Sequence, residues 1–143
     1  MNVAEVRLTH QVEFCAAHHL VAPGLSASDN QALYGPCARP HGHNYRLEVT
    51  VAGPVQAATG MVMDLNRLRA LVAERLVQRV DHLDLNRDVE FLLGAITTGE
   101  NLLVRFWDQL APALPEGVRL VELRLGETRD NGIVYHGPAA ARA

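Results

Sequence analysis

Two stretches of the chain alternate between apolar and polar positions, a pattern typical of strands that bury one face. From residue 6 to 18 nearly every second residue is apolar, and this row ends in His18. Between residues 41 and 52 the same alternation begins with His41 and His43 and continues through Tyr45 and aliphatic residues. Successive side chains of a strand point to opposite faces. The pattern therefore predicts two strands that each place histidines at one end of their inner face.

Farther along, apolar residues recur at three- and four-residue steps, which predicts two helices. A stripe over residues 65–80 follows Asp64, and aspartate is a favourable N-cap. Thr97, with Glu100 three residues later, predicts a capping box for the second helix, and Pro112 helps to end it. Both helices have one apolar face, so we expect both to pack against the sheet.

Two more strands complete the predicted fold. Residues 119–125 alternate again, which brings Glu127 to the apolar side if no β-bulge intervenes, and residues 133–136 form a short last strand. Residues 21–38 are rich in Gly, Pro, Ser and Asp, which predicts a long irregular loop. The order ββααββ predicts an α+β fold, a four-stranded antiparallel sheet with two helices on one face.

Length and charge narrow the class of protein. A chain of 143 residues predicts one domain over residues 1–143. The 13 basic residues are all arginine, and the formal net charge of -3 argues against binding to nucleic acid or to an anionic membrane. Two cysteines are too few for a disulfide framework. With no apolar signal segment behind the charged N-terminus, we expect a cytoplasmic protein.

Antiparallel pairing of the first two strands would bring their histidines together. The end of one strand would lie beside the start of the other, so His18 would meet His41 and His43, which share a face about 7 Å apart. A single histidine at the end of an apolar face is more often a packing residue than a ligand. Three that converge form the ligand set of a catalytic zinc, which keeps a fourth position open. His19 should face away.

Three other positions carry candidate chemistry. Cys37, four residues before His41, is compatible with a fourth ligand that closes a structural zinc, with an inert thiol, or with a thiolate whose pKa a metal lowers. Asp81 beside His82 has the composition of a proton relay, although such a pair also occurs in ordinary turns. Glu127, at the end of an inward face, needs hydrogen-bond donors, which a ligand rich in N–H groups would supply.

The chain resembles the family of 6-pyruvoyltetrahydropterin and 6-carboxytetrahydropterin synthases in six segments that span nearly its whole length. These segments are Phe14–Leu20 (FCAAHHL), Cys37–Tyr45 (CARPHGHNY), Gly60–Asp64 (GMVMD), Asp81–Asn86 (DHLDLN), Thr98–Leu102 (TGENL), and Glu127 with Thr128. The resemblance implies the tunnelling fold, in which subunits join their sheets into trimeric barrels and two trimers stack into a homohexamer. It also implies active sites between subunits.

The same resemblance implies roles for the candidate residues. The three histidines would bind Zn²⁺, which would hold the side-chain hydroxyls of the substrate, 7,8-dihydroneopterin triphosphate. Cys37 resembles the base that abstracts a proton, and Asp81 with His82 resembles the pair that relays protons. Glu127 resembles the anchor of the pterin ring, with Thr98 nearby. The implied enzyme is a zinc-dependent lyase.

One spacing selects a product within the family. The four residues from Cys37 to His41 resemble the carboxy-forming enzymes, which predicts conversion to 6-carboxy-5,6,7,8-tetrahydropterin, acetaldehyde and triphosphate in queuosine biosynthesis. The alternatives are a 6-pyruvoyltetrahydropterin synthase, an enzyme that forms a side-chain-cleaved pterin, a tri-histidine zinc hydrolase, and a non-catalytic zinc-stabilised assembly module closed by Cys37.

The sequence also departs from the common pattern of the family. His19 replaces a frequent arginine, Leu65 replaces a frequent phenylalanine, and the loop over residues 21–36 is longer than in minimal members. No lysine is available for the triphosphate, so only arginines can bind it.

Overall fold

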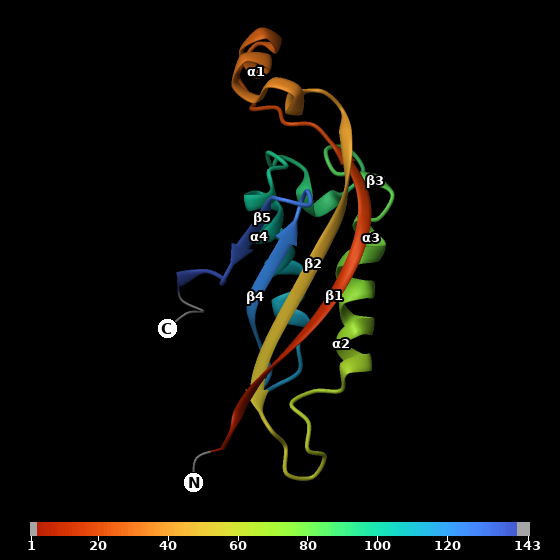
Figure 1. Cartoon of the computed structure of the whole chain (residues 1–143), viewed down its shortest axis with the longest axis vertical. Helices are drawn as coiled ribbons and strands as arrows, with labels where there is room; N and C mark the ends of the chain where they lie inside the picture. The colour runs from red at the N-terminus through yellow and green to blue at the C-terminus, as the bar shows by residue number, and fades with distance from the viewer. Residues whose placement is uncertain (1–2, 140–143) are drawn as a thin grey trace.

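Two long antiparallel strands run the length of the molecule in the computed structural model, which describes residues 3–139. They are β1 (Glu5–His18) and β2 (His41–Pro54), and they pair without interruption until His18 lies opposite His41 (Figure 1). On the face that is buried, β2 presents Tyr45 and the aliphatic residues that follow it at every second position. The predicted pairing of the two histidine-bearing strand ends is confirmed.

The sheet contains five strands in the order β3-β1-β2-β4-β5. β4 (Arg119–Gly126) and β5 (Gly132–Tyr135) extend it antiparallel, whereas β3 (Leu83–Asp84) runs parallel to β1. The prediction of four antiparallel strands is therefore wrong in this detail, because β3 has only two residues and cannot show an alternating pattern. The pairing of β2 with β4 shifts after Thr50, so a bulge lies upstream of Glu127 and leaves its inward direction intact.

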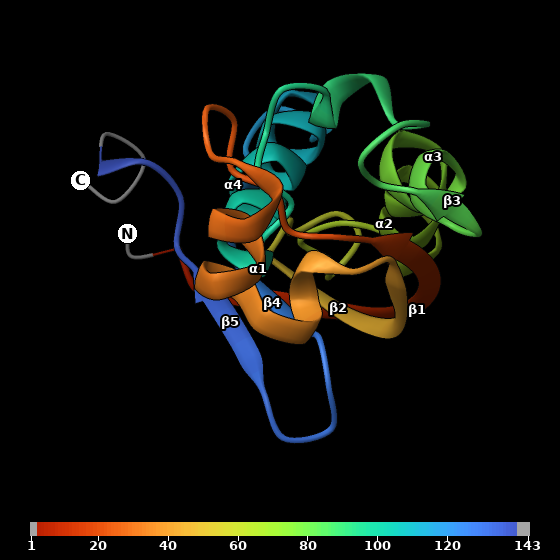
Figure 2. The ribbon, with the colours of Figure 1, turned by 90° about the horizontal axis from the view of Figure 1, so that it is seen from above.

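Two long helical segments cover one face of the sheet (Figure 2). The first is continuous through α2 (Leu65–Val72), a π-helical turn (Ala73–Val77) and α3 (Gln78–Val80), and it begins at Asp64, whose side chain accepts the N–H of Asn66. The second is α4 (Gly99–Leu110), which a 3₁₀ turn at Ala111–Ala113 ends. A further 3₁₀ turn, Glu90–Leu92, lies between the two. None of the helices within residues 3–139 is long and apolar enough to cross a membrane.

The segment predicted as an irregular loop contains a third helix. α1 (Ala27–Tyr34) and a 3₁₀ turn (Gly35–Ala38) project beyond the ends of β1 and β2 (Figure 1). Ser26 caps α1 by accepting the N–H of Asp29, and the buried side chain of Asn30 accepts the N–H of Ala22 at 2.8 Å. Sequence periodicity missed α1 because nearly all of its side chains are exposed, so it has no apolar stripe.

Candidate functional site

Three imidazole rings meet where β1 ends and β2 begins. One nitrogen from each of His18, His41 and His43 can be chosen so that all three atoms lie within 4.8 Å of one another. The ring centroids are separated by 4.6 to 5.1 Å. The register explains this, because His18 lies opposite His41 and His43 follows on the same face of β2. The convergence predicted from the alternating pattern is confirmed.

Backbone carbonyls fix which nitrogen of two rings is free. Nδ1–H of His18 donates to the carbonyl oxygen of Thr97 at 2.9 Å, and Nδ1–H of His41 donates to the carbonyl oxygen of Arg39 at 2.7 Å. A carbonyl oxygen only accepts, so each Nδ1 carries the proton and each Nε2 presents a lone pair. Hydrogen bonds of this kind orient the histidines of metal sites in proteins.

The free nitrogens fit a metal ion. Nε2 of His41 and Nε2 of His43 are buried and have no hydrogen-bond partner among the residues that the structure describes. Buried polar atoms without a partner are unfavourable unless another group satisfies them. Burial lowers the pKa of His18 to about 4 and also lowers that of His43, so both rings are neutral at pH 7, as ligation requires. Three imidazoles that leave one coordination position open match a zinc site.

The metal-free protein should lose stability as the pH falls from about 6.5 to about 4.5. An unfolded chain binds a proton on histidine near pH 6.5, whereas folded His18 does so only near pH 4. The unfolded state then carries more protons, so acid favours unfolding by up to about 3 kcal/mol. Urea unfolding of chelator-treated protein at several pH values measures this slope. His18→Gln should remove most of it, and a flat profile for the wild type would contradict the buried neutral histidine.

Glu127 faces the histidine cluster. Its Oε1 lies 3.2 Å from Nε2 of His43 and 3.8 Å from Nε2 of His18, without the geometry of a hydrogen bond to either nitrogen. A tight turn holds it in place, because its N–H donates to the carbonyl oxygen of Asn131 at 3.0 Å. The side chain is 26% exposed, so the carboxylate lines the site and is open to a ligand. The structure thus places Glu127 where the alternating pattern of β4 predicts it.

Two residues that the sequence analysis did not assign to the site complete the surroundings of the cluster. Tyr45 is fully buried, its hydroxyl oxygen lies 3.4 Å from Nε2 of His18, and desolvation, with the nearby Glu127 carboxylate, raises its pKa. Thr97 is fully buried and supplies the carbonyl that orients His18. The alternation that includes His41 and His43 also includes Tyr45 and could have identified it. No local signal reports the Thr97 contact, which spans 79 residues of sequence.

Thr97 is not the N-cap of α4, which corrects the predicted capping box. The N-cap is Thr98, whose hydroxyl oxygen accepts the N–H of Asn101 at 3.3 Å. The prediction was wrong by one residue because both positions carry threonine, and in the structure Thr97 is buried against His18 while Thr98 caps the helix. Thr98 is partly exposed, and its expected contact with a ligand stays a prediction.

Asp81 and His82 form a pair at the edge of β1. Oδ1 of Asp81 accepts the N–H of Cys15 and lies 2.9 Å from Nδ1 of His82. The hydrogen bond from the Cys15 N–H lowers the pKa of Asp81, and the smaller contribution of His82 acts in the same direction. The N–H of His82 donates to the carbonyl oxygen of Cys15 at 2.6 Å, and its backbone has a φ of 61°. Non-glycine residues rarely adopt such a conformation, and it concentrates at functional sites.

Cys37 is exposed in the 3₁₀ turn that follows α1. Its carbonyl oxygen accepts the N–H of Leu20 at 2.7 Å, which ties the turn to the chain beyond β1. Among residues 3–139, the group of close potential ligand atoms consists of the three histidines and does not include Cys37. This arrangement disfavours a fourth, closing ligand. The catalytic roles expected for Cys37, Asp81 and His82 stay predictions.

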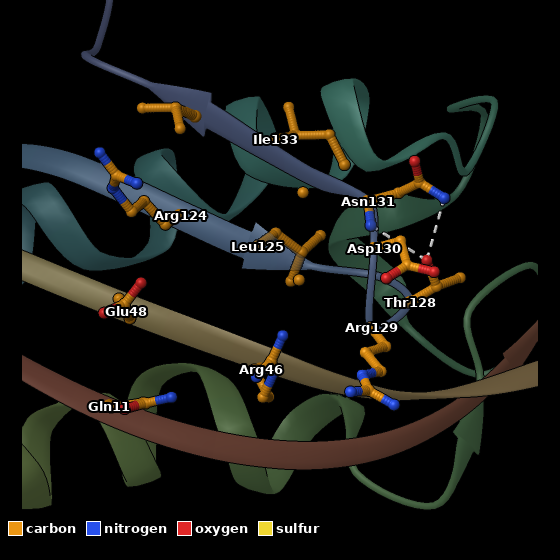
Figure 3. A pocket seen from close by; sticks show the side chains of 13 residues that line it. Gln11, Arg46, Glu48, Arg124, Leu125, Thr128, Arg129, Asp130, Asn131 and Ile133 are labelled. Carbon is orange, nitrogen blue, oxygen red and sulfur yellow. Dashed lines mark hydrogen bonds between the residues drawn. The ribbon is translucent and has the colours of Figure 1, made fainter.

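A hollow of about 420 Å³ lies on the sheet face opposite the helices (Figure 3). Arg46 and Arg124 from the strands and Arg129 from the following turn line it, together with the acidic side chains of Glu48 and Asp130. The three histidines do not line it. Its mixed charges belong to a surface distinct from the candidate metal site.

The fold and the site define an α+β enzyme domain with a three-histidine centre at the end of its sheet. The family model described as 6-pyruvoyl tetrahydropterin synthase matches residues 7–138. The chain therefore belongs to the 6-pyruvoyl tetrahydropterin synthase family of lyase-type enzymes. The resemblance to the tunnelling-fold synthases is confirmed at this level.

Individual relatives agree with the family assignment. The chain is 40% identical over 132 residues to 6-pyruvoyl tetrahydrobiopterin synthase of Dictyostelium discoideum, which covers 92% of this chain and 96% of that protein. The structure of Caenorhabditis elegans 6-pyruvoyl tetrahydropterin synthase superposes with a TM-score of 0.88 at 31% identity, covering 96% of this chain and 99% of that one. A putative 6-carboxy-5,6,7,8-tetrahydropterin synthase of Archaeoglobus fulgidus is 33% identical over 77% of this chain and 87% of that protein.

The prediction of a 6-carboxytetrahydropterin product is wrong. Five relatives at 38 to 41% identity are named 6-pyruvoyl tetrahydrobiopterin synthase, and the carboxy-forming relative is more distant. The four-residue spacing from Cys37 to His41 misled the prediction. In the structure this segment is the end of a 3₁₀ turn and a short link into β2, so its length describes a chain connection and not the contacts that select a product.

Proposed function

We propose that the protein is a zinc-dependent synthase that converts 7,8-dihydroneopterin triphosphate into 6-pyruvoyltetrahydropterin and triphosphate. The observation that carries the proposal is the cluster of His18, His41 and His43, with two unpartnered buried nitrogens and the Glu127 carboxylate beside it. The names of the relatives support the product. Substrate and products balance as an internal redistribution of hydrogens followed by elimination, so the reaction needs no external oxidant or reductant.

The three histidines would hold the zinc ion through their Nε2 atoms. When bound, zinc would supply Lewis acidity towards a hydroxyl group of the substrate side chain. The protein contributes orientation, because the carbonyl oxygens of Thr97 and Arg39 fix two of the rings in advance. Glu127 would accept hydrogen bonds from the amine and ring N–H groups of the pterin, with Thr98 nearby, and so set the distance between ring and metal.

Cys37 and the Asp81–His82 pair would move protons. The exposed thiol of Cys37 would remove a carbon-bound proton once it is deprotonated. Asp81 Oδ1 lies 2.9 Å from Nδ1 of its neighbour His82, and the exposed imidazole would relay protons with the carboxylate orienting its ring.

We extend the proposal to the assembly, a homohexamer of two trimers with active sites between subunits. Two edges of the sheet support it. β3 covers only the segment of β1 at Ala16 and Ala17, and β5 pairs with β4 alone among the described residues. Backbone groups at such edges can pair with another chain. Light scattering coupled to size-exclusion chromatography measures the number of subunits.

Product analysis tests the proposed reaction. Incubation of the zinc-loaded protein with 7,8-dihydroneopterin triphosphate should yield 6-pyruvoyltetrahydropterin and triphosphate by chromatography. A chelator should abolish turnover while circular dichroism shows little unfolding, because the core does not depend on the metal. Recovery of another pterin would overturn the product, and unfolding on chelation would favour a structural zinc module.

A further inference from the structure

The hydroxyl group of Tyr45 has no role in the proposed reaction, yet it is buried at the metal site. Tyr45 is fully buried between Phe14, whose ring stacks on it at 5.0 Å, and His43, whose ring centroid lies 5.3 Å away. Among the described residues, the hydroxyl has one hydrogen-bond partner, Nε2 of His18 at 3.4 Å. A buried hydroxyl is unfavourable without a partner, so the fate of this bond matters.

The donor in the bond between Tyr45 and His18 follows from the hydrogen bond that the second nitrogen of the His18 ring makes. Nδ1–H of His18 donates to the carbonyl oxygen of Thr97, so Nε2 is the acceptor and Tyr45 donates. A metal ion bound to His18 would use the same lone pair on Nε2. The hydroxyl and the metal therefore exclude each other at this atom, and metal loading frees the Tyr45 hydrogen.

The Glu127 carboxylate is a hydrogen-bond acceptor that lies near the same nitrogen of His18. Oε1 of Glu127 lies 3.8 Å from the same Nε2 atom of His18. It lies 3.2 Å from Nε2 of His43, a second nitrogen that a metal would occupy. The Tyr45 hydroxyl oxygen and Oε1 of Glu127 therefore lie 3.4 Å and 3.8 Å from one shared atom, Nε2 of His18. A hydrogen bond to a carboxylate is stronger than one to a neutral imidazole.

We propose that Tyr45 is a positioning residue that transfers its hydrogen bond from His18 to Glu127 when the metal binds. The inference rests on the metal site of the proposed function and deepens it. The hydroxyl holds Glu127 in its ligand-binding orientation only in the metal-loaded protein. The site therefore binds its components in order, the metal first and the N–H-rich ring of the substrate second.

Zinc affinity in a double-mutant cycle tests the transfer. Competition with a chromophoric chelator gives the affinities of the wild type, Tyr45→Phe, Glu127→Ala and the double variant. Because the bond gained is stronger than the bond lost, Tyr45→Phe should weaken zinc binding by about 3- to 10-fold. In the Glu127→Ala background the same substitution should have no effect or should tighten binding, because only the competing bond to His18 is left to remove.

A control variant accompanies this experiment, and different outcomes would contradict the hydrogen-bond transfer and the proposed function. Tyr135→Phe, at a tyrosine that packs on Trp107, should leave zinc affinity unchanged. Tighter or unchanged zinc binding by Tyr45→Phe, or an equal loss in both backgrounds, would overturn the transfer alone. A wild-type protein that does not bind zinc would overturn the proposed function as well.

A crystal structure of the zinc-loaded wild type gives a second measurement that needs no variant. The Tyr45 hydroxyl should lie within hydrogen-bond distance of a Glu127 carboxylate oxygen. A hydroxyl that is still paired with His18, or that has no partner, would overturn the transfer.

Discussion

Replacing Cys37 with alanine should lower kcat by about 10²- to 10⁴-fold, the contribution typical of a positioned proton-transfer group. Zinc should stay bound at one ion per chain, because Cys37 lies outside the cluster of potential ligand atoms. The side chain is exposed, so the substitution removes no core contact and the stability should change little. Steady-state kinetics combined with zinc quantitation on the same sample measures both quantities.

Cys15→Ala is the matched control for this experiment. Cys15 is the other cysteine of the chain, it is also exposed, and it contributes only backbone groups to the contact with Asp81 and His82. It should keep wild-type kcat and zinc content. Loss of zinc from Cys37→Ala would make Cys37 a ligand and not a base, whereas unchanged kcat would remove it from the mechanism.

His41→Ala should abolish zinc binding at working concentrations and, with it, turnover. The loss of one of three protein ligands should weaken zinc affinity by roughly 10³-fold or more. His41 is only partly buried and its ring bonds to the Arg39 carbonyl, so the metal-free fold should persist. His18 is a less suitable position, because its buried ring is bonded to Thr97 and its removal also disturbs the core.

His19→Ala serves as the control for the histidine substitution. Its position adjoins a proposed ligand, yet its hydrogen bonds within residues 3–139 are made by its backbone, which bonds to the side chains of Asn86 and Thr97. Zinc content should match the wild type. One zinc per chain in His41→Ala, at wild-type affinity, would show that the cluster is not the metal site.

Long periodic elements were predictable from the sequence because tertiary packing imposes one apolar face on them. The strands β1, β2 and β4 and the helical segments over residues 65–80 and 99–110 all have such a face. β3 has two residues, and α1 exposes nearly all of its side chains, so neither leaves a periodic trace. Their existence depends on contacts between distant segments, such as the bond from Leu85 N–H to the Ala17 carbonyl.

The candidate site also has features that were predictable from the sequence and features that were not. His18, His41, His43 and Glu127 were predictable, because each occupies an inward position of an alternating strand or directly follows one. The Thr97 carbonyl that orients His18 was not predictable, since a backbone atom leaves no signature in residue type. The product was not predictable from a spacing, because chemistry at a fixed metal depends on where the substrate and the acids and bases lie.

The attachment of Asp81 and His82 to the backbone of Cys15 sets a length scale for the whole site. Cys15 precedes the proposed ligand His18 by three residues of one extended strand, a separation on the order of 10 Å. A paired strand cannot shorten, so no loop closure within one subunit can bring the Asp81–His82 pair up to the histidine cluster. Any molecule that touches both within a subunit must itself bridge that gap, which sets a minimum size for such a ligand.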